Sequence, residues 1–153
     1  MLSSTLLVAL SAALVAASPV WPRFTVANEH FEVLAMRAST EVNPDAASDV
    51  TCIDPNATIA FHDQNVAELG ICGGIAGSIT KCQGAPTSTV GESATAKFSL
   101  NAVTPGATIN VSKGRWEQCV RAAQAVCPTG SLSATCAGGA SSGDVAFTLD
   151  STA

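Results

Sequence analysis

The chain has 153 residues, a formal net charge of −5 and only 12% charged residues, about half the ~25% of an average globular chain. Seven basic residues stand against twelve acidic ones, so we expect no nucleic acid partner and no binding to anionic membranes, since both need clustered lysine and arginine. Six cysteines in so short a chain indicate an oxidising compartment.

Residues 1–17 are predicted to be a secretory signal peptide. The run from Leu6 to Ala17 is apolar except for Ser11. It is too short for a membrane span of about 20 residues but has the length of a signal's apolar region. No basic residue precedes the run, and cleavage after Ser18 is nearly as well supported as cleavage after Ala17. We therefore expect a secreted, extracellular protein with no membrane span.

Residues 18–51 are expected to form a flexible spacer or pro-segment. They hold five acidic residues and no cysteine, and the stretch Ser39–Asp49 is polar. They contain no dibasic pair, so a furin-type cut has no obvious site. The predicted domain is therefore residues 52–153, which carry five basic and seven acidic residues and are nearly neutral.

All six cysteines belong to this domain: Cys52, Cys72, Cys82, Cys119, Cys127 and Cys136. An even count in a short secreted segment predicts three disulfides, but the spacing does not choose among the pairings. No close cysteine pair or histidine pair has the spacing of a zinc site, so neither a metal nor another cofactor is expected.

The first predicted helix begins at Asp54, a suitable cap, with Pro55 at its first position, and runs to Cys72 before two glycines. Its predicted inward face is Ile59, His62, Val66 and Leu69. The region Cys82–Ser93, rich in glycine, proline, serine and threonine, is expected to be a loop.

Three segments alternate with a period of two and are predicted to be strands. The first is Ala96–Ala102, the second is its hairpin partner at 108–112 after a Thr-Pro-Gly turn, and the third is centred on Phe147. The predicted inward side chains are Ala96, Phe98, Leu100, Ala102, Ile109, Val111, Val145, Phe147 and Leu149.

A second helix is predicted from the cap Gly114, with Glu117 in its first turn, to Pro128. Its apolar stripe is Trp116, Cys119, Val120, Ala123, Val126 and Cys127. We expect Trp116 to be a core anchor rather than a stacking platform for a sugar. The predicted fold is α+β and two-layered, with an antiparallel sheet of three to four strands, two helices packed on it, and disulfides as staples.

Two N-glycosylation sequons begin at Asn56 and at Asn110, and both asparagines are expected to be exposed. No catalytic residue and no enzymatic activity are predicted, because no catalytic motif occurs. Of the two histidines, His30 lies in the spacer and His62 is expected at the edge of the core. His62 and Asp63 are neighbours on the predicted helix and therefore point to different faces.

Four segments together resemble a known family. They are the helix that ends at Cys72 with Gly-Gly behind it, the strand AKFSLNA with its partner TINVS, the helix segment CVRAAQAVC, and the closing CAGGASSGDVAFTLDS. This pattern resembles small secreted fungal domains related to the ink-cap mushroom glycan-binding lectin, most specifically in its C-x-G-G and T-L-D-S segments. The resemblance covers 52–153 and implies a compact α+β domain, secretion and carbohydrate binding. It carries over no sugar-contacting residue.

The chain is thus predicted to be a secreted, disulfide-rich fungal glycoprotein with a lectin-like module that binds a glycan of unknown identity. The alternative is a secreted effector or toxin-like protein that acts on a host or competitor protein or membrane. A single sugar site in so small a domain is expected to be weak, so a homodimer or multivalent display would be needed for avidity.

Overall fold

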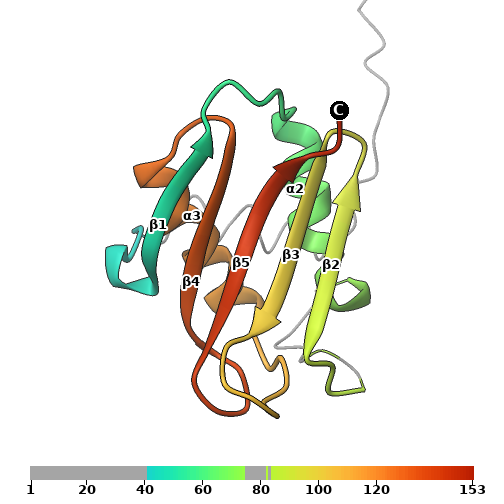
Figure 1. The fold of residues 1–153 in the computed structure, drawn as a ribbon, viewed down its shortest axis with the longest axis vertical. Coiled ribbons are helices and arrows are strands. Elements are labelled where there is room, and N and C mark those ends of the chain that lie inside the picture. Colours follow the sequence, from blue (N-terminus) through green and yellow to red (C-terminus); the bar gives the residue numbers. More distant parts are fainter. Residues whose placement is uncertain (1–40, 75–81, 83) are drawn as a thin grey trace, which may run out of the picture.

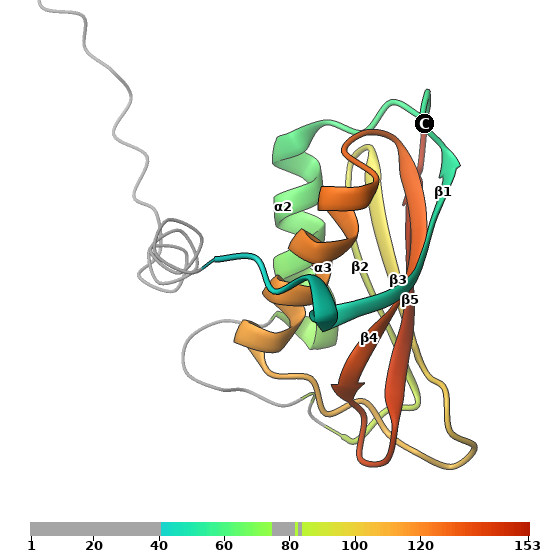
Figure 2. The same ribbon diagram turned by 90° about the vertical axis from the view of Figure 1, so that its left-hand side faces the viewer.

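The computed structural model describes residues 41–74, 82 and 84–153; the predicted signal peptide and most of the predicted spacer lie outside these residues. The described chain forms one five-stranded antiparallel sheet with helices α2 and α3 on one face (Figures 1 and 2). The elements are η1 Pro44–Ala46, β1 Ala47–Asp54, α2 Phe61–Gly70, η2 Ile71–Gly73, β2 Ser88–Ser93, β3 Ala96–Ala102, α3 Lys113–Val126, β4 Ser131–Gly139 and β5 Asp144–Ser151. The α+β class is confirmed, but the sheet has five strands rather than three to four.

The strands lie in the order β1-β4-β5-β3-β2, and every neighbouring pair is antiparallel. The predicted alternation on β3 and β5 is confirmed, because these strands pair along their length and bury their apolar side chains under the helices. The buried side chains of this pair are Ala96, Phe98, Leu100, Val145, Phe147 and Leu149. The opposite face of the sheet carries mainly polar side chains, and no helix of the described residues covers it (Figure 2).

The hairpin predicted for β3 is wrong. Its partner is β2, Ser88–Ser93, which was expected to lie in a loop, while residues 108–112 form only one bridge, between Ile109 and Ala140. The segment 108–112 is instead held by isolated backbone hydrogen bonds. Ile109 N–H donates to the Pro86 carbonyl at 2.7 Å, and Asn110 N–H donates to the Gly139 carbonyl at 2.6 Å.

The sheet begins earlier in the chain than the predicted domain does. Strand β1, Ala47–Asp54, pairs with β4, so the predicted spacer boundary at Thr51 falls inside a strand. A bulge between Ser48 and Thr51, with Asp49 at φ 52°, interrupts the apolar alternation of this edge strand and hides it from sequence patterns. Strand β1 therefore includes five residues assigned to the spacer, Ala47 to Thr51.

Helix α3 is close to its predicted form. It begins two residues earlier than predicted, because the Ser112 side chain rather than Gly114 caps it, accepting from Arg115 N–H at 3.3 Å. The predicted stripe is buried, except that Val126 is 59% exposed at the helix end. Trp116 is confirmed as a core anchor: its ring centroid lies 5.3 Å from that of Phe98 and 5.0 Å from that of Phe147, both edge-to-face.

Helix α2 is shorter than predicted, and it turns a different face toward the sheet than the predicted one. It begins at Phe61 rather than at Pro55, because Asp54 builds a turn: its carboxylate accepts from Asn56 N–H at 2.9 Å and its carbonyl from Ala57 N–H at 3.2 Å. The predicted inward face is wrong, since His62 is exposed and Val66 is 39% exposed. The side chains buried against the sheet are Gln64, Ala67, Glu68 and Ile71.

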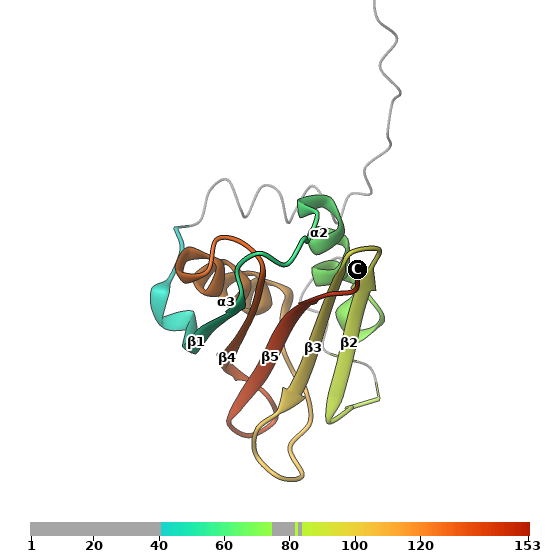
Figure 3. The ribbon, with the colours of Figure 1, turned by 45° about the horizontal axis from the view of Figure 1, so that its top comes forward.

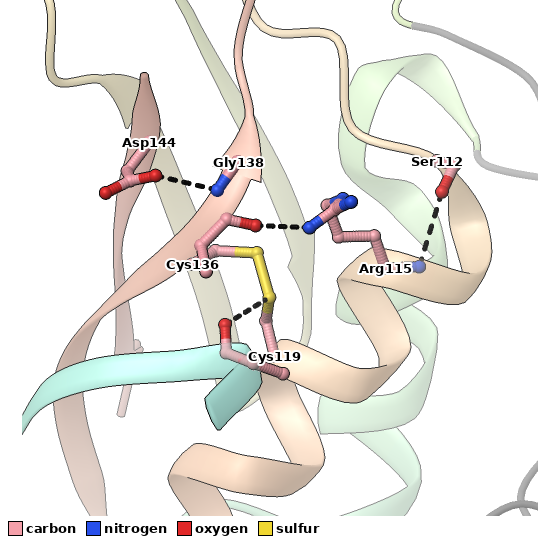
Figure 4. The surroundings of a disulfide bond; sticks show 8 residues. Ser112, Arg115, Cys119, Cys136, Gly138 and Asp144 are labelled. Carbon is pink, nitrogen blue, oxygen red and sulfur yellow. Dashed lines mark hydrogen bonds between the residues drawn. A yellow bond between two sulfur atoms is a disulfide. The ribbon is translucent and has the colours of Figure 1, made fainter. Parts of the chain in front are cut away.

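Three disulfides are confirmed: Cys52–Cys127, Cys72–Cys82 and Cys119–Cys136. The first joins the edge strand β1 to the end of α3, and the third joins the middle of α3 to β4 (Figure 4). The Ala46 carbonyl oxygen lies 3.2 Å from Cys119 Sγ, a close sulfur–oxygen contact, since a disulfide sulfur carries no proton to donate. Among the described residues, no helix is long and apolar enough to cross a membrane.

Candidate functional site

A hollow of about 480 Å³ is lined in part by the connection from β1 to α2. This connection runs past the ends of the strands at one end of the domain (Figure 3). The walls of the hollow come from residues 57–59, the first turn of α2, the last turn of α3 and the loop 127–130. Leu132 of β4 and Leu149 of β5 also line it, and both are almost completely buried. The hollow therefore has an apolar lining where it meets the sheet and lies between segments far apart in the chain.

Phe61 stands beside this hollow with 72% of its surface exposed. It is the first residue of α2, and the helix turns a different face, that of Ala67 and Ile71, toward the sheet. A single exposed aromatic residue is common on protein surfaces. Phe61, however, borders the larger of the two hollows, and ligand sites typically combine a concave surface, aromatic rings and a few polar groups.

The polar groups of the hollow are two amides and two hydroxyls, carried by Gln64, Gln124, Thr58 and Thr129. Gln64 is only 8% exposed, yet its side chain makes no hydrogen bond within the described residues, and the same holds for Gln124. Thr129 Oγ1 donates to the Pro55 carbonyl at 3.2 Å. Each free amide offers two donors and one acceptor oxygen, so a ligand rich in hydroxyls would find both kinds of partner.

No acidic, basic or histidine side chain lies among the described residues that line the hollow, and its one cysteine, Cys127, is in a disulfide. The described lining thus carries no formal charge, and it contains no carboxyl, imidazole, amine or free thiol for general acid–base chemistry. Such a surface favours a neutral polar ligand, whose binding would depend little on salt.

The structure places His62 and Asp63 outside this lining. His62 is exposed rather than at the core edge, so that expectation is wrong. Asp63 is occupied structurally: its carboxylate accepts from Thr95 Oγ1 at 2.7 Å and from Thr95 N–H at 3.2 Å. These hydrogen bonds, the side-chain one first, lower the pKa of Asp63 below its usual value.

The two predicted sequons lie in different surroundings. Asn56 is exposed in the turn after β1, and the next two residues, Ala57 and Thr58, line the hollow. Asn110 is half-buried, and its Oδ1 is buried without a hydrogen-bond partner in the described chain.

A second, shallower hollow of about 260 Å³ lies on the open face of the sheet. Its polar lining consists of Asp49, Ser99, Asn101, Ser133, Thr135 and Thr148. This surface offers hydroxyls but no exposed aromatic ring, which makes it the weaker candidate.

No protein-family model, no curated protein and no solved structure matches the chain. The resemblance to the ink-cap lectin domains therefore stays an expectation.

No residue of the hollow was predicted to bind a ligand: Ile59, Cys127 and Leu149 were assigned to the core. Phe61, Gln64 and Gln124 belong to the two predicted helices but lie outside their predicted apolar faces. The one available signal was Phe61 itself, an aromatic residue that lies outside the predicted apolar stripe of its helix.

Proposed function

We propose that the domain is a secreted carbohydrate-binding module that binds a neutral sugar in the Phe61 hollow and catalyses no reaction. The observation that carries the proposal is the exposed Phe61 ring at the edge of an uncharged hollow with two free amides. The three disulfides are compatible with the secretion that this function requires.

The chemistry of a sugar matches this arrangement. A pyranose ring presents an apolar C–H face and an equatorial belt of hydroxyl groups. An aromatic ring can stack on the apolar face. The amides of Gln64 and Gln124 can donate hydrogen bonds to the hydroxyl groups and accept hydrogen bonds from them. The volume of about 480 Å³ lies within the range of about 300–1,000 Å³ that is usual for small-ligand sites.

Binding without chemistry is supported by the same lining. Hydrolysis of a glycosidic bond ordinarily needs a pair of carboxyl groups across the scissile bond. None of the described residues around the hollow carries a carboxyl group.

The test is an array of free and immobilised glycans probed with the purified full chain, followed by titration of the best ligand. Phe61→Ala should weaken binding by about tenfold, the loss expected from one stacking contact. Its thermal midpoint should stay near that of the wild type, because the ring buries little surface. Val103→Ala is the matched control, since Val103 is 56% exposed but lies outside the hollow.

A second pair of variants distinguishes the two hollows. Gln124→Ala should weaken binding, whereas Asn101→Ala on the open face of the sheet should not. The reverse result would move the sugar to the sheet face. If the chain bound no glycan on the array but bound a defined protein or lipid target, the effector alternative would be favoured instead. Light scattering of the same sample measures whether the chain forms the homodimer that avidity would call for.

A further inference from the structure

We propose that an N-glycan on Asn56 stands over the Phe61 hollow and competes with free sugar, so that glycosylation of this one asparagine sets the affinity of the site. The proposal rests on the proposed function, since it assigns a regulator to the same hollow. Three observations carry it: the exposure of Asn56, the placement of the two residues that follow it, and the unsuitability of Asn110.

Asn56 is open to modification. Its backbone N–H donates to the Asp54 carboxylate at 2.9 Å, and its side-chain amide makes no hydrogen bond within the described residues. The third residue of the sequon, Thr58, is exposed as well. Ser151 Oγ donates a hydrogen bond to the Thr58 backbone carbonyl at 3.0 Å. The Thr58 hydroxyl makes no hydrogen bond in the described chain.

Asn110 is a poor alternative. Its Oδ1 is buried, the next residue, Val111, is 1% exposed, and the hydroxyl of Ser112 is engaged in capping α3. A glycan attached to Asn110 before folding would have to be accommodated on a half-buried side chain whose Oδ1 is enclosed. We therefore assign the modification to Asn56 alone.

The modification is a transfer from a lipid diphosphate-linked oligosaccharide. Asn56 Nδ2 forms a bond to the anomeric carbon of the first sugar and loses one proton. The bond from that carbon to the diphosphate oxygen breaks, and the lipid diphosphate leaves with the bonding pair. No oxidant or reductant takes part.

The attachment point determines what the glycan can reach. Ala57 and Thr58, directly after Asn56, form part of the hollow's wall. A glycan on Asn56 is therefore tethered at the edge of the opening. Tethered sugars act at an effective concentration in the millimolar range. Against a single site with a dissociation constant of the same order, such a concentration raises the apparent Kd for free sugar by about two- to tenfold.

The experiment uses the full chain secreted from a eukaryotic host that N-glycosylates. Mass spectrometry of peptides measures occupancy at each sequon, and titration with the best array glycan measures Kd. Three samples are compared with the wild type: Asn56→Gln, Asn110→Gln, and wild type trimmed by an endoglycosidase to one sugar per site. Asn56→Gln keeps the turn, because only the backbone N–H of this residue bonds to Asp54.

We expect Asn56 to be occupied and Asn110 to be empty, and we expect Asn56→Gln and the trimmed protein to bind two- to tenfold more tightly than wild type. Asn110→Gln should match wild type. An unmodified Asn56, or equal Kd values for occupied and unoccupied protein, would overturn the proposal while leaving the sugar site intact. Failure of every form to bind any glycan would overturn the proposed function and the competition with it, whatever the occupancy.

Discussion

Replacing Gly91 by alanine tests the seating of α2 on the sheet, which is what positions Phe61 and Gln64. Gly91 lies on β2 under the helix, and a Cβ built there would come within 2.0 Å of the Ala67 carbonyl oxygen and 2.8 Å of the Ile71 nitrogen. Real Cβ atoms essentially never approach other atoms more closely than 3.0 Å. Both obstacles are backbone atoms and cannot rotate away, so the helix must move by about an ångström, which is a case of overpacking.

The expected cost follows from two opposing effects. Overpacking of a filled core costs about 1–3 kcal/mol, and the backbone contact places Gly91→Ala at the upper end. Alanine also restricts the unfolded chain, which returns about 0.4–1 kcal/mol. The free energy of unfolding should therefore fall by about 2 kcal/mol. In a domain of this size, that loss lowers the thermal midpoint by about 8–16 °C.

Urea and thermal unfolding followed by circular dichroism measure this loss. The matched control is Gly70→Ala in the last turn of α2, where the nearest atom to a new Cβ is Gly91 Cα at 3.7 Å and the backbone is helical. Gly70→Ala should stabilise by about 0.5–1 kcal/mol. Wild-type stability in Gly91→Ala would refute the close contact of helix and strand. Equal losses in both variants would refute the stated cause.

Two further predictions concern the core and pH. Trp116→Ala should lower the free energy of unfolding in urea by about 3–5 kcal/mol; near-normal stability with lost sugar binding would show that the ring is a platform after all. Asp63→Asn keeps an acceptor for Thr95 but removes the charge, so wild type should melt at a higher temperature than this variant at neutral pH. Because the folded pKa of Asp63 is lowered, that advantage is full above the ordinary carboxyl pKa of 3.8 and is lost as the pH falls through the folded value. If wild type and Asp63→Asn differed in melting temperature by the same amount in acid as at neutral pH, the stabilising role of the Asp63 charge would be contradicted.

The elements that sequence patterns predicted are those that bury large apolar side chains. Strand β3 alternates Phe98 and Leu100 with polar residues, β5 does the same with Phe147, and α3 shows its stripe around Trp116. In each case the periodicity of burial equals the periodicity of large apolar residues, so the pattern is visible without the structure.

The missed strands bury mostly small residues instead. Strand β2 faces the helix with Gly91, whose lack of a side chain is what allows α2 to approach, and β4 turns Ala134 and Cys136 inward beside a single large apolar residue, Leu132. Edge strand β1 is interrupted by its bulge. Hydrophobic alternation cannot show strands whose packing depends on small size, and disulfides contribute stability that apolar patterns do not record.

The face of α2 was mispredicted for a related reason. The apolar residues of the segment, among them Val66, suggest one face, but the close contact with β2 favours the side of the helix that carries Ala67. Only a small residue fits where the helix backbone nearly touches the strand. Steric fit therefore overrode hydrophobic pattern, and Phe61 was left on the outside of the helix, where a ligand can reach it.

The hollow depends on two chain connections held against each other. Gly130, at φ 77°, lies so close to β1 that an added Cβ would come within 2.0 Å of the Asp54 carbonyl. Cys127, which lines the hollow, is bonded to Cys52, two residues before Asp54, and the turn that starts at Asp54 leads to the lining residues 57–59. The disulfide therefore fixes the loop after α3 against the connection that leads to Phe61. The cysteines that help to shape this site can be recognised in the sequence. The residues that face the ligand cannot be recognised there, because they follow no apolar pattern or motif.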